Sequence, residues 1–161
     1  MKKLLAVLVV AVAAIGIGVT AAMSSGDGRS VLKFDTMAPV VAPYTGATNP
    51  IRGVPGGGVP WQLGLASGRL RADGRLQIEV EGLVIVATGV NPVATFRGLV
   101  SCQSIDANGA PTIVNVSTDP VPATTTGNAE IDARVSLPSP CFAPIVFVTS
   151  GGGAWFAATG R

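Results

Sequence analysis

Alternation of apolar and polar residues is the strongest pattern along this sequence. Leu76, Ile78 and Val80 alternate with polar side chains, and residues 129–137 repeat the pattern. A period of two residues places the apolar side chains on one face of a half-buried β-strand. Further stretches with apolar residues at strand spacing lie at 31–37, 61–65, 83–87, 96–105, 112–118, 145–149 and 155–159. No helical period is sustained after the N-terminal segment, so the pattern predicts seven to nine short strands.

Turn residues separate these runs. Asp73-Gly74 lies between two alternating stretches, while Asp-Ala-Asn-Gly at 106–109 and three glycines at 151–153 separate later pairs. Asp, Asn and Gly tolerate the positive φ angles of tight hairpin turns. Frequent short strands with regular turn signals are typical of β-sandwiches. The sequence therefore predicts an all-β fold, a Greek-key-like β-sandwich, in one domain over residues 31–161. The run at 83–87 is unbroken and predicts a strand buried on both faces.

Residues 38–60 lack a strand pattern and form the longest predicted loop. They are rich in proline and include the sequence Gly-Val-Pro-Gly-Gly-Gly at 53–58. Loops of this length are usually functional or mobile, and a proline-stiffened loop loses less entropy on binding. The candidate binding residues are therefore Tyr44, Arg52 and Trp61, of which the two aromatic residues can stack on sugar rings. Trp155, within the last hairpin, is expected to fill the core instead.

The N-terminal segment has the features of a secretory signal. Lys2 and Lys3 precede an apolar run at 4–19, and Thr-Ala-Ala follows at 20–22. A positive start, an apolar centre and small residues at the end predict cleavage after Ala22, with an uncleaved anchor as the alternative. We therefore expect a signal peptide at 1–22, a flexible leader at 23–30 and a secreted or extracytoplasmic domain.

The cysteine count indicates one disulfide. Cys102 and Cys141 are the two cysteines of the chain. In an exported protein such a pair predicts a disulfide bond between them. The loss of loop entropy in the unfolded chain predicts that this bond stabilises the fold by about 4 kcal/mol. The alternative, a free nucleophilic thiol, lacks a histidine to activate it.

Charge argues against nucleic acid as a partner. The chain has 11 Lys+Arg and 9 Asp+Glu, a net charge of +2. Lys2 and Lys3 leave with the signal peptide, so the mature chain is neutral overall. Phosphate backbones require several convergent cations. The expected partner is instead a protein or a glycan at the cell surface, with no membrane contact after signal cleavage.

The absence of histidine narrows the chemistry. It excludes the Ser-His-Asp and Cys-His arrangements and the usual zinc, copper and non-haem iron ligand sets. The residues around Asp106 and Asn108 lack the further acids of a calcium loop, and Gly53–Gly58 lacks the Lys-Ser/Thr of a phosphate-binding loop. We therefore predict no metal site and no cofactor.

One carboxylate pair leaves an enzyme open as an alternative. Glu79 and Glu81 are two apart on one strand face, which separates them by about 7 Å. Glycosidase pairs use separations of that order. The solvated face of an alternating strand explains the same residues. The sequence thus favours a non-catalytic module that acts by binding or by structure. The alternatives are an envelope polysaccharide enzyme that uses Glu79 and Glu81, or a secreted inhibitor that presents residues 40–60.

Four stretches carry a resemblance to other proteins. Residues 49–58, 91–96, 137–149 and 153–158 resemble an uncharacterised family of hypothetical secreted bacterial β-proteins with no assigned activity. Gly-Arg-Leu at 74–76 and Val-Glu-Gly-Leu at 80–83, followed by the closing hairpin, are similar to the CHRD domain, a secreted β-module. CHRD modules usually carry histidines, which this chain lacks, so the resemblance implies no functional residue here.

Overall fold

A computed structural model describes residues 29–160 as an all-β fold. The predicted signal peptide and most of the leader, within residues 1–28, lie outside the described residues, as does residue 161. Residues 29–160 form twelve strands, of which eight have four or more residues. The predicted all-β class is therefore confirmed. None of the described residues forms a helix that is long and apolar enough to cross a membrane.

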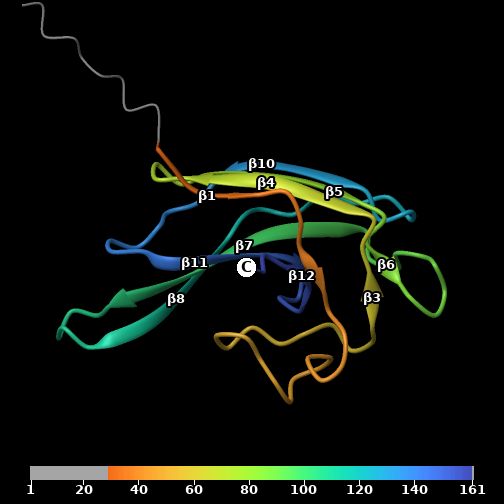
Figure 1. The fold of residues 1–161 in the computed structure, drawn as a ribbon, viewed down its shortest axis with the longest axis horizontal. Helices are drawn as coiled ribbons and strands as arrows, with labels where there is room; N and C mark the ends of the chain where they lie inside the picture. The colour runs from red at the N-terminus through yellow and green to blue at the C-terminus, as the bar shows by residue number, and fades with distance from the viewer. Residues whose placement is uncertain (1–28, 161) are drawn as a thin grey trace, which may run out of the picture.

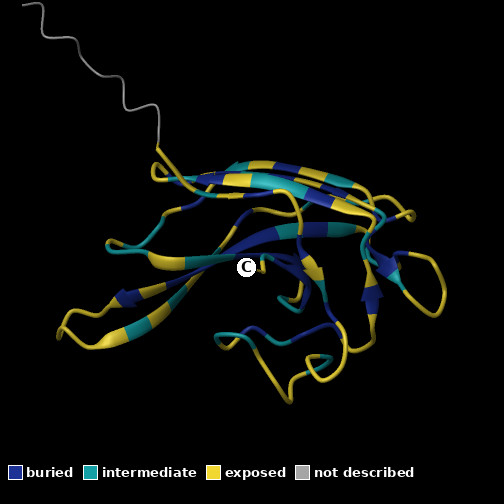
Figure 2. Cartoon of the chain, viewed as in Figure 1, coloured by how far each residue is buried: buried dark blue, intermediate teal, exposed yellow. Residues whose placement is uncertain are grey.

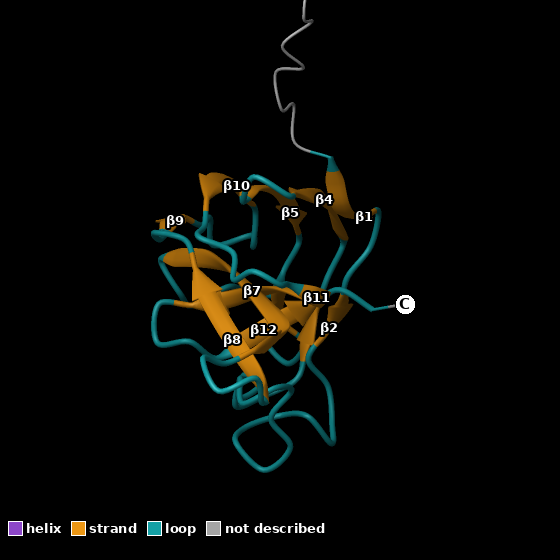
Figure 3. Ribbon diagram, turned by 90° about the vertical axis from the view of Figure 1, so that its left-hand side faces the viewer, coloured by secondary structure: helices purple, strands orange, loops and turns teal. Residues whose placement is uncertain are grey.

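The strands form two main antiparallel sheets, which lie one above the other (Figures 1 and 3). Sheet A has the order β1-β4-β5-β10, and sheet B has the order β2-β12-β11-β7-β8 with β9 beside β7. A third, two-stranded sheet pairs β3 with β6. The bounds are β1 (Ser30–Phe34), β2 (Ala38–Pro39), β3 (Trp61–Gln62), β4 (Leu65–Arg71), β5 (Arg75–Glu81), β6 (Val84–Ile85), β7 (Thr95–Ile105), β8 (Pro111–Ser117), β9 (Val121–Pro122), β10 (Ala129–Arg134), β11 (Phe142–Ser150) and β12 (Trp155–Ala158).

The predicted period of two places the core between the sheets. In β5 the residues Leu76, Ile78 and Val80 are buried, whereas their neighbours point to the outer face of sheet A. Figure 2 shows the resulting alternation along sheet A. At Gly98 of β7 the sheets approach closely, since a Cβ there would lie 2.7 Å from a methyl carbon of Leu76. Burial of these side chains is the main stabilising term of the fold.

The predicted hairpin turns are present. Gly74 has φ of 85° and closes the β4–β5 turn, with its N–H donating to the Arg71 carbonyl at 3.0 Å. Asp106 accepts hydrogen bonds from the N–H groups of Asn108 and Ala110, which shapes the β7–β8 turn. The side chain of Asp106 thus stabilises this turn.

The apolar run at 83–87 differs from its prediction. Only Val84–Ile85 form a strand, because Gly89 and Thr88 both donate backbone hydrogen bonds to the Ile85 carbonyl and turn the chain. Val86 is therefore 53% exposed instead of buried. Here a local turn overrides the apolar pattern.

The predicted disulfide is confirmed. Cys102 of β7 and Cys141, just before β11, are bonded across a sequence separation of 39 residues. Since β7 and β11 are neighbours in sheet B, the bond fixes the entry of β11 next to its partner strand.

Residues 40–60 form a closed loop on the side of sheet B that faces away from sheet A (Figures 1 and 3). Within the loop, the Gly46 and Gly57 segments exchange backbone hydrogen bonds. The loop also adds to sheet B, because the Gly57 N–H donates to the Trp155 carbonyl at 2.8 Å and the Trp155 N–H donates to the Pro55 carbonyl at 2.9 Å. Val54, within the loop, is buried. The loop is therefore an integral part of the fold.

Candidate functional site

Trp61, one of the three candidate binding residues, is a core residue. Its side chain is 3% exposed, and its ring stacks on Phe156 with 4.0 Å between the ring centroids. The backbone N–H of Trp61 donates to the Val40 carbonyl, and this bond joins the two ends of the 40–60 loop. Trp61 has no open ring face to offer to a sugar, and we leave it out of the site.

Tyr44 lies on the free surface of the 40–60 loop. Its side chain is 44% exposed, beside a backbone that the Tyr44 N–H and the Val41 carbonyl fix with a hydrogen bond of 2.8 Å. Val41 and Val59 are also exposed on this loop. Tyr44 is not among the residues that line a pocket with Arg52. The structure therefore does not bring the three sequence candidates together.

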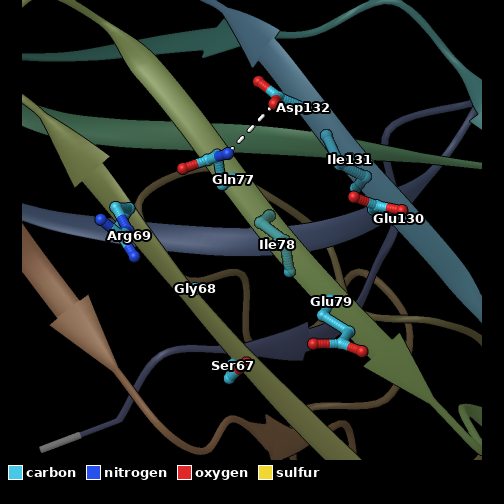
Figure 4. Close-up of a pocket in the computed structure, with 9 residues that line it drawn as sticks. All are labelled: Ser67, Gly68, Arg69, Gln77, Ile78, Glu79, Glu130, Ile131 and Asp132. Carbon is cyan, nitrogen blue, oxygen red and sulfur yellow. Dashed lines mark hydrogen bonds between the residues drawn. The ribbon is translucent and has the colours of Figure 1, made fainter.

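Glu79 and Glu81 lie on the outer face of sheet A, where both are exposed. The strand register places Glu130 of β10 directly opposite Glu79, and Ser67 of β4 on its other side. A shallow depression of about 300 Å³ includes these three residues (Figure 4). The nearest cross-strand carboxylate to Glu79 is thus Glu130, which belongs to a strand that the sequence pattern did not link to it.

The other end of the same face is an ion network. Asp132 accepts hydrogen bonds from Arg75 at 2.8 Å and from Gln77 at 3.0 Å (Figure 4 shows the latter). The hydrogen bond from Arg75 is the largest cause that lowers the pKa of Asp132, followed by that from Gln77. The Arg75 N–H likewise lowers the pKa of Asp73, which also pairs with Arg134 at 3.0 Å. Asp132 and Asp73 thus stabilise the pairing of β5 with β10 in sheet A.

Arg52 is held in a strained turn at the edge of the 40–60 loop. Ile51 and Val54 form a bridge with backbone hydrogen bonds in both directions, at 3.0 and 3.1 Å. Arg52 and Gly53 between them have φ of 49° and 80°, a two-residue turn with both φ angles positive. Glycine adopts this conformation freely, whereas a left-handed arginine costs about 1 kcal/mol.

Tertiary hydrogen bonds fix both the side chain and the backbone of Arg52. Its guanidinium Nη1 donates to the carbonyl of Ser101 in β7 at 3.0 Å, and its own carbonyl accepts from Nδ2 of Asn115 in β8 at 3.1 Å. Burial lowers the pKa of Arg52. No carboxylate of residues 29–160 forms an ion pair with it. Arg52 is therefore a partly buried cation that donates to a backbone carbonyl and has no ion pair within residues 29–160.

Arg52 lines a pocket of about 420 Å³, a volume within the usual range for small-ligand sites. The lining residues are Leu32, Arg52, Ala143, Pro144, Ile145, Thr159 and Gly160. Ala143 has φ of 41°, and within residues 29–160 it is the one other non-glycine residue with a positive φ. Both strained residues thus line one pocket. Backbone strain of this kind clusters at functional sites, where the surrounding structure maintains it.

The chemistry of this pocket favours binding of an anion. A guanidinium presents several N–H donors in one plane and matches a carboxylate with two parallel hydrogen bonds. Leu32, Pro144 and Ile145 supply an apolar wall beside it. The lining residues include no acid, histidine or cysteine that would transfer a proton or attack a substrate. We call this set of residues the Arg52 pocket.

The sequence indicates Arg52 as a candidate but gives no sign of its pocket. Ala143 carries no sequence signal, and the contact between Arg52 and Ser101 joins residues that are 49 positions apart. Within the part of the chain that the structure describes, no three His, Cys, Asp or Glu side chains come together to hold a metal ion.

Comparisons with known proteins identify no relative of this chain. No family model, no curated protein and no solved structure matches it.

Proposed function

We propose that this protein is a secreted or cell-surface module that acts by binding and not by catalysis, and that the Arg52 pocket takes a carboxylate-bearing ligand. The observation that carries the proposal is the placement of Arg52. It is partly buried, it has no ion pair within residues 29–160, and it shares a pocket with the other residue of positive φ that is not glycine, Ala143.

The energetics support an anionic ligand. Burial of a cation costs free energy unless an opposite charge compensates it. A carboxylate that enters the pocket provides that charge, and it gains hydrogen bonds to an ionised donor that are each worth about 1.5–3 kcal/mol. The turn around Arg52 is bonded to itself and to β7 and β8, so the guanidinium loses little freedom on binding. The apolar wall favours a ligand whose carboxylate is attached to a non-polar body.

The test is a set of NMR titrations with matched acids and neutral analogues. The three pairs are benzoate with benzamide, glucuronate with glucose, and acetyl-dialanine with its C-terminal amide. We expect an acid to shift the amide resonances of Thr159 and Gly160, and its neutral analogue to leave them in place. Benzoate tests whether a carboxylate on a non-polar body binds at all. The stronger response of the other two pairs then indicates whether the natural carboxylate belongs to a sugar or to a peptide.

Two arginine variants provide the control. Arg52→Gln removes the charge and keeps a polar side chain, so the acid should bind about tenfold more weakly or worse. Arg69→Gln removes an arginine that lines the depression on sheet A and should leave the affinity unchanged. No response to any acid, or an equal response of both variants, would contradict the proposal.

The observation that favours an enzyme is the opposition of Glu79 and Glu130 in the shallow depression on sheet A. Two carboxylates across one site are the arrangement of glycoside hydrolysis. This second candidate predicts hydrolysis of an envelope polysaccharide that is lost in both Glu79→Gln and Glu130→Gln. Retention of such hydrolysis in either variant would exclude these residues as the catalytic pair.

A further inference from the structure

The sheet edges of this protein differ in their protection against pairing with another strand. Exposed edges are normally blocked by charges, prolines, bulges or short length. The edge strand β10 carries Glu130, Asp132 and Arg134. β1 carries Lys33 and has an irregular register, and β2 has two residues, one of which is a proline. Three of the four edges of the two main sheets therefore have a recognisable block.

The fourth edge, β8, has none of these devices over most of its length. Its seven residues, Pro-Thr-Ile-Val-Asn-Val-Ser, include no charged side chain, and proline occupies the first position alone. The register with β7 is regular from end to end. Its side chains alternate between exposed and half-buried. Among the sheet edges of residues 29–160, β8 is thus the long and uncharged one, with a regular register.

The backbone of β8 has unused hydrogen-bonding groups on its free side. The Thr118 N–H donates to Gly98 at 2.8 Å, and the Asp106 N–H donates to Ala110 at 2.9 Å. In an antiparallel ladder these bonds recur at every second residue, so even-numbered residues of β8 bond to β7. The N–H and C=O groups of odd-numbered residues therefore point away from the sheet. These residues are Ile113, Asn115 and Ser117.

We propose that β8 pairs with β8 of a second copy of this chain, antiparallel and about a twofold axis at Asn115. In this register Asn115 lies opposite its symmetry mate, and Ile113 lies opposite Ser117 of the second copy. Each of the three residues then donates one hydrogen bond and accepts one. A shift of the axis to Ile113 would place Pro111, which has no N–H, opposite Asn115 and lose bonds.

A second copy is the occupant because the edge is self-complementary. Antiparallel pairing about a twofold axis brings each strand against its own sequence. β8 has no charge to repel its mate, whereas like charges directly opposite each other destabilise a strand pair. The pairing also places Val114 beside Val116 of the second copy, and such pairs of β-branched residues stabilise sheets. The exposed side chain of Ile113, 42% exposed, becomes covered at the seam.

Sedimentation velocity of the full chain, expressed with its own N-terminal segment and purified from the extracytoplasmic fraction, tests this pairing. We expect the wild type to show a monomer–dimer equilibrium. Two double variants share one change and differ in the other: Ile113→Lys/Ser117→Glu places opposite charges across the seam, and Ile113→Lys/Ser117→Lys places like charges there. Both positions are exposed in the monomer. The dissociation constant of the Lys/Lys variant should exceed that of the Lys/Glu variant about tenfold.

Amide hydrogen exchange on the wild type provides a test without substitutions. The N–H groups of Ile113, Asn115 and Ser117 should become protected as the protein concentration rises, whereas protection of the Gly109 N–H, which bonds within its own turn, should stay constant. A wild type that remains monomeric at every concentration would overturn the proposal. Equal dimerisation of the two double variants, or loss of the dimer in both, would overturn it as well, because the seam would then lie elsewhere.

Discussion

A methyl group placed at Gly56 tests how the 40–60 loop is fixed to sheet B. A Cβ at this position would overlap the backbone carbonyl oxygen of Tyr44 and lie 3.0 Å from a methyl carbon of Val40. The first of these neighbours is main chain and cannot rotate away, so one of the two loop segments must move. A Cβ at Gly58, two residues further on, meets no atom within 4 Å. Gly58→Ala is therefore the matched control for Gly56→Ala.

The expected cost of Gly56→Ala follows from the contacts that the movement breaks. The Gly56 N–H donates to Gly46 at 2.9 Å, and the next N–H donates to Trp155 at 2.8 Å. Each such bond contributes about 1 kcal/mol, and overpacking adds about 1–3 kcal/mol. We expect the free energy of unfolding to fall by about 3–5 kcal/mol, the sum of two such bonds and the overpacking. Gly58→Ala should instead stabilise by up to about 1 kcal/mol, because alanine restricts the unfolded chain.

Urea unfolding followed by tryptophan fluorescence measures this difference. Trp61 and Trp155 are the two tryptophans of the chain, and each makes a backbone hydrogen bond to a residue of the 40–60 loop, so the signal reports on the loop. Equal midpoints for the two variants would refute the reasoning. Unchanged global stability of Gly56→Ala with faster proteolysis between residues 40 and 60 would also contradict it, because the loop would then unfold independently of the core.

Three further predictions concern the rest of the fold. Cys102→Ala/Cys141→Ala should lower the free energy of unfolding by about 4 kcal/mol, which urea unfolding measures against the oxidised wild type. An unchanged midpoint would show that the bond constrains little. Asp132→Asn should flatten the acid limb of the stability–pH curve. Because its hydrogen bond from Arg75 lowers the pKa of Asp132, this carboxylate stabilises the fold above its unfolded-state pKa of about 3.9. That stability is lost as the pH falls through the folded-state pKa, and an identical acid limb in the variant would exclude this contribution. Gly98→Ala should destabilise by about 1–3 kcal/mol in thermal unfolding, because the new methyl group meets side chains of sheet A. A variant as stable as the wild type would show that the sheets can separate locally.

The strands and turns could be predicted from the sequence because their signals are local. Residues 75–81 and 129–134 alternate strictly, and each period-two pattern has one buried face whichever strands it pairs with. The cysteine pairing could be predicted because the chain has two cysteines and an N-terminal segment with the features of a secretory signal. The prediction that residues 83–87 form a fully buried strand was wrong, because hydrophobicity alone does not indicate the turn in which the Gly89 N–H bonds to the Ile85 carbonyl.

The site could be predicted only in part because its geometry is non-local. Trp61 follows a proline-glycine loop, and nothing in the sequence indicates that Phe156, almost one hundred residues later, covers its ring. The loop composition indicates Arg52 as a candidate, whereas the positions of its guanidinium and its carbonyl depend on contacts with Ser101 and Asn115 in sheet B. Ala143 lies next to a proline with no pattern around it. Contacts between segments that are distant in the sequence determine such sites, and the periodicity of a single sequence carries no information about these contacts.

The measurement that tests the central claim most directly is an affinity capture with three forms of the oxidised protein. Wild type, Arg52→Gln and Arg69→Gln are immobilised and exposed to the host's envelope extract and secreted fraction. We predict one enriched carboxylate-bearing glycan or protein that wild type and Arg69→Gln retain and Arg52→Gln loses. Enrichment that is equal on all three forms, or none above a bare matrix, would contradict a binding module that acts through the Arg52 pocket.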